Sequence, residues 1–203
     1  TPTCSCGLGA KWIARAGLAP SQTMIGVNRL ALPSSAQGCG RVQWCGEGRR
    51  DGRPMRITSP AFAEGETIPI AHTCSGSDEP PPLEWTAPLS GTQSLALVMD
   101  DPDAPGGVFT HWLAWGFPPT SRGVGPDDPP PHEGRNDFGT VGYRGPCPPP
   151  GHGEHRYRLR LHALGRPLDL AAGSDRRRLD AALVGRVLQT AQLTGRFARA
   201  EPQ

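Results

Sequence analysis

From residue 55 onward, apolar residues occur in short runs separated by turns rich in glycine and proline, a pattern typical of strands in a sandwich or barrel. Residues 94–100 are almost continuously apolar, which predicts a strand buried on both faces. Residues 157–163 alternate strictly, which predicts a strand with Arg158, Arg160 and His162 pointing outward. Its inward residues are expected to be Tyr157, Leu159, Leu161 and Ala163.

Two further segments complete the pattern. Residues 111–117 predict another strand, and simple alternation places four of its residues on one face: His111, Leu113, Trp115 and Phe117. Near the end of the chain, apolar residues recur every fourth position, which predicts a helix that begins at an N-cap near Ser174 and stops near Gly195. The repeating residues are Leu179, Leu183, Val187 and Ala191. The expected fold is mostly β with a C-terminal helix.

Residues 1–54 lack both periodicities, and a polar, glycine-punctuated run ends at Pro54. This segment carries seven basic and two acidic residues, whereas the rest of the chain carries 14 basic and 17 acidic residues. We therefore expect a basic, cysteine-containing, disordered extension over 1–54 and one folded domain over 55–203. A basic extension could contact nucleic acid or anionic lipid, but neither partner is expected here.

Composition narrows the classes of protein further. The 203 residues include 27 Gly and 24 Pro, which is too many helix-breaking residues for a helical bundle or a coiled coil. No apolar run reaches the roughly 18 residues that a membrane span needs. No secretory signal is apparent, so the sequence predicts a cytoplasmic protein with free thiols, Cys74 and Cys147 being small buried residues.

Polar side chains of a kind that can bind an anion follow the predicted strands. Asp101 and Asp103 come directly after the buried strand, His111 begins the next one, and a long Gly/Pro loop over 135–151 leads to His155 and Tyr157. If these segments converge, imidazole, phenol and backbone N–H groups could together bind a phosphate, with Gly145 and Cys147 supplying the amides. Asp101 would then hold a histidine in its donating tautomer and favour its protonated form.

Simpler interpretations stay open for each segment. The Asp-Pro-Asp-Ala-Pro run at 101–105 is ordinary turn chemistry, and the loop could be a rigid connector. His and Asp are also common metal ligands, yet no spacing in the chain is diagnostic of a metal site, so no metal or cofactor is expected.

The segments, taken in order, resemble the phosphatidylethanolamine-binding protein family in its bacterial Raf-kinase-inhibitor-like branch. The resemblance covers residues 55–199 and rests on Asp-Asp-Pro-Asp-Ala-Pro at 100–105, His-Trp at 111–112, Gly-Pro-Cys-Pro-Pro at 145–149 and His-Arg-Tyr at 155–157. Further matches are Thr-Ser-Pro-Ala-Phe at 58–62, Pro-Pro-Leu at 81–83 with Trp85, and Asn-Asp at 136–137.

The resemblance implies a β-sandwich of antiparallel sheets with Greek-key links and a small anion pocket at one end. The ligand-binding residues that it implies are Asp101, Asp103, Pro105, His111, Gly145, Cys147, His155 and Tyr157, with Pro105 and Cys147 at the rim. The main hypothesis is a non-enzymatic module that binds phosphate or phosphorylated head groups and has a regulatory role. The alternatives are a protein-interaction module that inhibits a kinase or protease, and a small-molecule hydrolase that uses the Asp/His cluster. Because bacterial relatives often dimerise, a homodimer is a further alternative.

Overall fold

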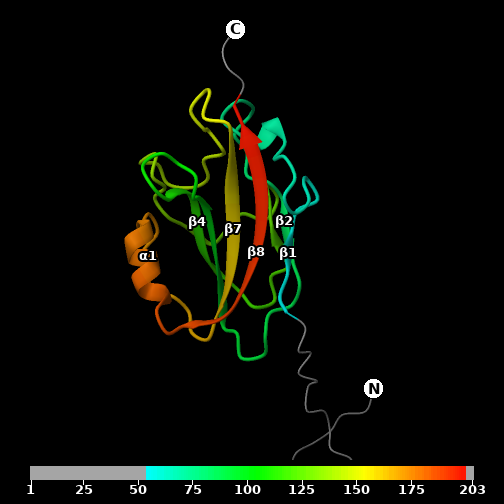
Figure 1. The fold of residues 1–203 in the computed structure, drawn as a ribbon. Coiled ribbons are helices and arrows are strands. Elements are labelled where there is room, and N and C mark those ends of the chain that lie inside the picture. The colour runs from blue at the N-terminus through cyan, green and yellow to red at the C-terminus, as the bar shows by residue number, and fades with distance from the viewer. Residues whose placement is uncertain (1–53, 200–203) are drawn as a thin grey trace, which may run out of the picture. The chain divides into compact units, whose positions relative to one another are not determined.

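The computed structural model describes residues 54–199, which form two antiparallel sheets and one α-helix (Figure 1). The large sheet has the strand order β6-β4-β3-β7-β8, and the small sheet has the order β1-β2-β5. The large-sheet strands are β3 (Ser94–Asp101), β4 (Phe109–Phe117), β6 (His132–Glu133), β7 (Glu154–Leu164) and β8 (Val187–Ala198). The remaining elements are β1 (Ile57–Thr58), β2 (Leu83–Trp85), β5 (Gly123–Val124), the short 3₁₀ helix η1 (Ile70–His72) and α1 (Arg176–Leu183).

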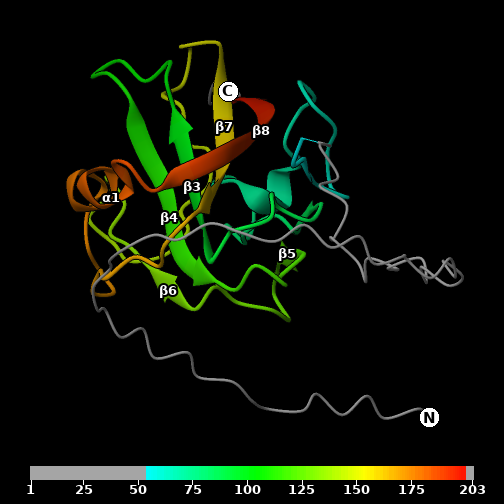
Figure 2. The same ribbon diagram turned by 90° about the horizontal axis from the view of Figure 1, so that it is seen from below.

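The large sheet is covered on both faces, which explains why all eight residues of β3 are buried. Alternate residues of β3, including Leu97 and Met99, join the small sheet in one apolar cluster. The others, Ala96 and Val98, pack with Leu179 of α1 in a second cluster. Figures 1 and 2 show α1 on one side of the large sheet and the small sheet on the other. The antiparallel two-sheet fold expected from the sequence is confirmed.

Strand β7 follows the predicted alternation, but β4 does not follow its own. Tyr157, Leu159, Leu161 and Ala163 belong to the cluster between the sheets, as expected. Met99 of β3 pairs with Trp112 of β4, and the next residue, Asp100, pairs with Thr110. His111 of β4 is therefore the extra residue of a β-bulge. The bulge turns His111 toward Tyr157, whereas Leu113 and Trp115 face α1. The prediction that His111, Leu113, Trp115 and Phe117 share a face is therefore wrong.

The predicted helix exists but is much shorter than the four-residue repeat indicated. Its N-cap is Asp175, one residue after the predicted Ser174, and the Asp175 side chain accepts a hydrogen bond from the Arg178 N–H. The helix ends at Leu183, and Gly185 adopts a positive φ of 69° that favours glycine. The segment expected to continue the helix is β8, which pairs with β7 along its length. Gly195, the predicted stop, lies inside β8 against Ile68, where no side chain fits.

The prediction of a disordered extension over 1–54 lies almost entirely outside the described residues. Within residues 54–199, no helix has the length and apolar character needed to cross a membrane.

Candidate functional site

A buried carboxylate and a buried histidine meet at the end of the large sheet where β3 ends and β7 begins. His155 Nδ1 donates to Asp101 Oδ2 at 2.8 Å, and each side chain is 4% exposed. A carboxylate oxygen only accepts, so the proton lies on Nδ1 of His155 and its Nε2 is the ring atom left for another partner. Asp101 thus orients a histidine as the sequence predicts, and that histidine is His155.

The bulged His111 lies beside this pair. Its Nδ1 donates to the backbone carbonyl of Arg144 at 2.8 Å, which fixes the proton on Nδ1. Burial lowers the pKa of His111, and this effect outweighs the nearby carbonyls and carboxylates that act in the opposite direction. His111 is therefore a neutral imidazole whose Nε2 carries a lone pair.

Tyr157 supplies a phenol at the same place. Its ring meets that of His111 edge-on, with 5.2 Å between the centroids. Tyr157 is fully buried, and its hydroxyl has no hydrogen-bond partner among the described residues. Burial, reinforced by the charge of Asp101 and by the closeness of that carboxylate to the hydroxyl, raises the pKa of Tyr157, so the phenol keeps its proton. A buried donor with no partner is rare in folded proteins and identifies a place where a ligand or a water can bind.

Asp103, which the sequence predicts to be a ligand-binding residue, stabilises the turn after β3 through its contacts with Arg156. Its carboxylate accepts from Arg156 three times, from the backbone N–H at 2.9 Å, from Nε at 2.8 Å and from Nη2 at 2.6 Å. These hydrogen bonds to Arg156 lower the pKa of Asp103 to about 2. The Asp103 N–H in turn donates to Asp101 Oδ1 at 2.8 Å, which holds Asp101 in place. Pro105 is exposed in this same turn.

The Gly/Pro loop is tied to the segment that follows η1. Cys74 and Cys147 form a disulfide, so the prediction of free thiols at these two positions is wrong. The Gly145 N–H donates to Asp78 Oδ1 at 2.7 Å, which corrects the expectation that this amide serves a ligand. Arg144 Nε also pairs with Asp78, at 3.1 Å. Sequence reasoning missed Asp78 because it lies 67 residues before Gly145.

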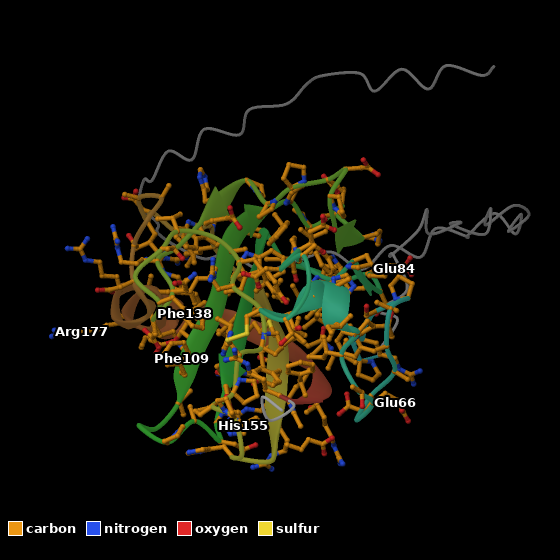
Figure 3. All side chains as sticks on the ribbon, turned by 90° about the horizontal axis from the view of Figure 1, so that it is seen from above. Glu66, Glu84, Phe109, Phe138, His155 and Arg177 are labelled. Atoms are coloured by element: carbon orange, nitrogen blue, oxygen red, sulfur yellow. A yellow bond between two sulfur atoms is a disulfide. The ribbon has the colours of Figure 1, made fainter. Side chains whose placement is uncertain are left out.

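The rings of Phe109 and Phe138 pack against that of His111. The ring of Phe138 meets that of Phe109 at 4.8 Å and that of His111 at 5.4 Å. The Arg144 guanidinium lies 5.6 Å from the centre of the Phe138 ring. Figure 3 shows Phe109 and Phe138 together, with His155 at the same end of the domain.

The arrangement suits a small polar ligand better than a metal ion. Residues 54–199 contain no group of three or more His, Cys, Asp or Glu side chains that could hold a metal. The site instead combines one phenol donor, one imidazole lone pair and one imidazole whose orientation a carboxylate fixes.

Comparison with known proteins identifies the family. The model of the phosphatidylethanolamine-binding protein family matches residues 58–198. The chain belongs to this family. A solved homologue of phosphatidylethanolamine-binding proteins from Chlamydia trachomatis superimposes with a TM-score of 0.67 at 31% identity, covering 72% of this chain and 98% of that one.

Relatives of known sequence come from archaea as well as bacteria. UPF0098 protein PH1269 of Pyrococcus horikoshii is 42% identical over 163 residues, which cover 76% of this chain and 82% of that protein. LppC of Mycobacterium tuberculosis, named as a candidate lipoprotein, is 40% identical over 146 residues, which cover 71% of this chain and 72% of that protein. A family member with such a name leaves the predicted cytoplasmic location unconfirmed.

Proposed function

We propose that this protein binds phosphate or a phosphorylated head group at the site formed by Asp101, His111, His155 and Tyr157, and that it acts through binding rather than catalysis. The observation that carries the proposal is the buried Tyr157 hydroxyl, which has no partner among residues 54–199. An oxyanion offers the acceptor that this donor needs, and Nε2 of His155 can donate to a second oxygen when the ring is protonated. The family description, which names a phospholipid, agrees with this chemistry.

Binding can be tested by NMR titration of the full chain with inorganic phosphate and phosphoethanolamine. We expect saturable shifts at Tyr157, His111 and the 143–147 loop, and their loss in His155→Ala, because that substitution removes a ligand-facing imidazole. His132→Gln is the matched control, since His132 is exposed on β6 and pairs with Trp115, near the other end of β4. Shifts that persist unchanged in His155→Ala would contradict the proposed site, as would the absence of shifts at millimolar ligand.

A second candidate role, docking of a partner protein such as a kinase or protease, rests on the aromatic rim. Phe138 is 41% exposed beside the site and carries Arg144 over its ring. Aromatic and arginine side chains of this kind are enriched at protein interfaces. Partner binding that is lost in Phe138→Ala but kept in His155→Ala would favour this role over ligand sensing.

A further inference from the structure

We propose that the site selects a singly charged phosphoryl group that still carries one proton, and discriminates against oxyanions without a proton. This inference rests on the proposed function, because it concerns the protonation state of the ligand at that same site.

The charges around the site favour a ligand with a single negative charge. The guanidiniums of Arg156 and Arg144 are already paired, with Asp103 and Asp78 respectively. Asp101 is a further negative charge beside the site, and a carboxylate repels a dianion more strongly than a monoanion.

Two other groups among the described residues can carry a positive charge near the site. Nη1 of Arg199 lies 4.0 Å from Cys147 Sγ, and His155 contributes a positive charge when it is protonated. Together with Asp101 and Asp137, which faces the His111 ring, they leave no net positive charge, so a second negative charge on the ligand is disfavoured. The ring of His152 lies 6.3 Å from that of His155, but His152 is exposed and is not part of the buried set.

The tautomer of His111 adds a requirement for a proton on the ligand. Its Nδ1–H is used by the Arg144 carbonyl, so Nε2 can only accept. The groups that face this ring are Asp101 from β3, Asp137, and the Arg144 and Gly145 carbonyls from the loop; all four favour the charged ring, yet burial keeps its pKa lowered. Among the described residues, none donates to His111 Nε2.

A protonated phosphoryl group fits these three side chains at once. Its P–OH donates to His111 Nε2, and its unprotonated oxygens accept from the Tyr157 hydroxyl and from Nε2 of the protonated His155 ring. A sulfuryl group of the same shape presents only acceptors, so it places an oxygen lone pair against that of His111. Leaving one buried acceptor unpaired in this way weakens binding by about tenfold or more.

Methyl phosphate and methyl sulfate form a matched pair of probes for this proposal, because at pH 6 about half of the methyl phosphate is a monoanion with a proton to donate, whereas methyl sulfate is a monoanion with none. A phosphate monoester has a second pKa of about 6, so its protonated fraction falls from about one half at pH 6 to about one in a hundred at pH 8. We expect the full chain to bind methyl phosphate at least about tenfold more tightly than methyl sulfate at pH 6. We expect this preference to disappear by pH 8. Using the ratio at each pH cancels any effect of pH that acts equally on the binding of both probes.

His111→Gln tests whether His111 causes the preference for the protonated ligand. The amide of glutamine can donate as well as accept, so the preference for methyl phosphate at pH 6 should narrow toward unity, while His132→Gln should leave it unchanged. Equal binding of the two probes by the wild-type chain at pH 6, or a preference that persists at pH 8, would overturn the inference while leaving the proposed function intact. Failure of both probes and of phosphoethanolamine to bind would instead overturn the proposed function, and this inference with it.

Discussion

At the scale of single residues, the environment decides what each histidine does. His111 and His155 both donate through Nδ1, but one donates to a backbone carbonyl and the other to a carboxylate. His162 lies on the opposite face of β7, where its Nδ1 is 2.9 Å from Thr190 Oγ1. Burial, with further contributions from Arg160 and Arg176, lowers the pKa of His162 to about 4.

The lowered pKa of His162 predicts that the folded state loses stability as the pH falls. In the unfolded chain a histidine takes up its proton near pH 6.5, whereas in the folded protein it does so near pH 4, so the unfolded state binds more protons between these values. Between pH 7 and pH 4.5 the free energy of unfolding should fall by about 1 to 2 kcal/mol less in His162→Gln than in the wild type, after allowance for the partial exposure of His162. Urea unfolding at both pH values measures this difference. Parallel behaviour of wild type and variant would refute it, and His132→Gln serves as the exposed control.

At the scale of elements, a buried carboxylate ties α1 to the large sheet. Asp100 is fully buried and accepts from Arg158 Nε at 3.1 Å, from Arg176 Nη1 at 3.4 Å and from Arg160. Arg158 and Arg160 come from β7, and Arg176 comes from the first turn of α1. The two neighbouring aspartates of β3 therefore serve opposite faces: Asp100 anchors the helix and Asp101 orients His155.

Asp100→Asn should destabilise the domain because it leaves three half-buried guanidiniums without their shared anion. Removal of one partner from a buried ion pair destabilises a protein by about 3 kcal/mol or more. Asp180→Asn is the matched control, because Asp180 pairs with the same Arg176 but its side chain is 53% exposed. That change should lower the free energy of unfolding by less than about 0.5 kcal/mol. Similar losses in the two variants, measured by urea unfolding, would show that Asp100 does not anchor the helix.

At the scale of the whole molecule, the local sequence pattern was sufficient to predict strands β3 and β7. It was insufficient where contacts with distant segments determine the structure. The alternation of β7 is intrinsic to its sequence, and β3 is apolar because both faces of its sheet are covered. The four-residue repeat through Val187 and Ala191 suits a helix, but the segment at 187–198 is a strand. Its buried residues Ala191, Leu193 and Phe197 alternate, and β7 offers it a long pairing edge. The bulge at His111 has no local signal either, since it appears only in the register between β3 and β4.

The same limit explains what could be predicted of the candidate site. Short motifs identify Asp101, His111, His155 and Tyr157, and the structure brings these four side chains together. Sequence reasoning could not find the contact of Gly145 with Asp78, or that of Cys147 with Cys74, because both join loops about 70 residues apart. These contacts hold the loop whose Arg144 carbonyl fixes the His111 tautomer.

The disulfide therefore supports both the fold and the site, and its removal should affect both. It closes a loop of 73 residues, so Cys74→Ser/Cys147→Ser should lower the free energy of unfolding by about 2 to 4 kcal/mol. Because the freed loop carries the Arg144 carbonyl, the double variant should also bind phosphoethanolamine more weakly. Urea unfolding and NMR titration of wild type, reduced wild type and double variant measure the two effects, and reduction should reproduce the double variant.

Equal stability and equal affinity in all three forms would mean that the hydrogen bonds of Asp78 and Tyr143 hold the loop by themselves. Peptide mapping of the native protein, alkylated without prior reduction, should recover the peptides of Cys74 and Cys147 as one linked species. Disulfides of this kind persist in oxidising compartments, so a linked species in the native protein would argue against the reducing cytoplasm that the sequence predicts. Two alkylated thiols would restore that prediction.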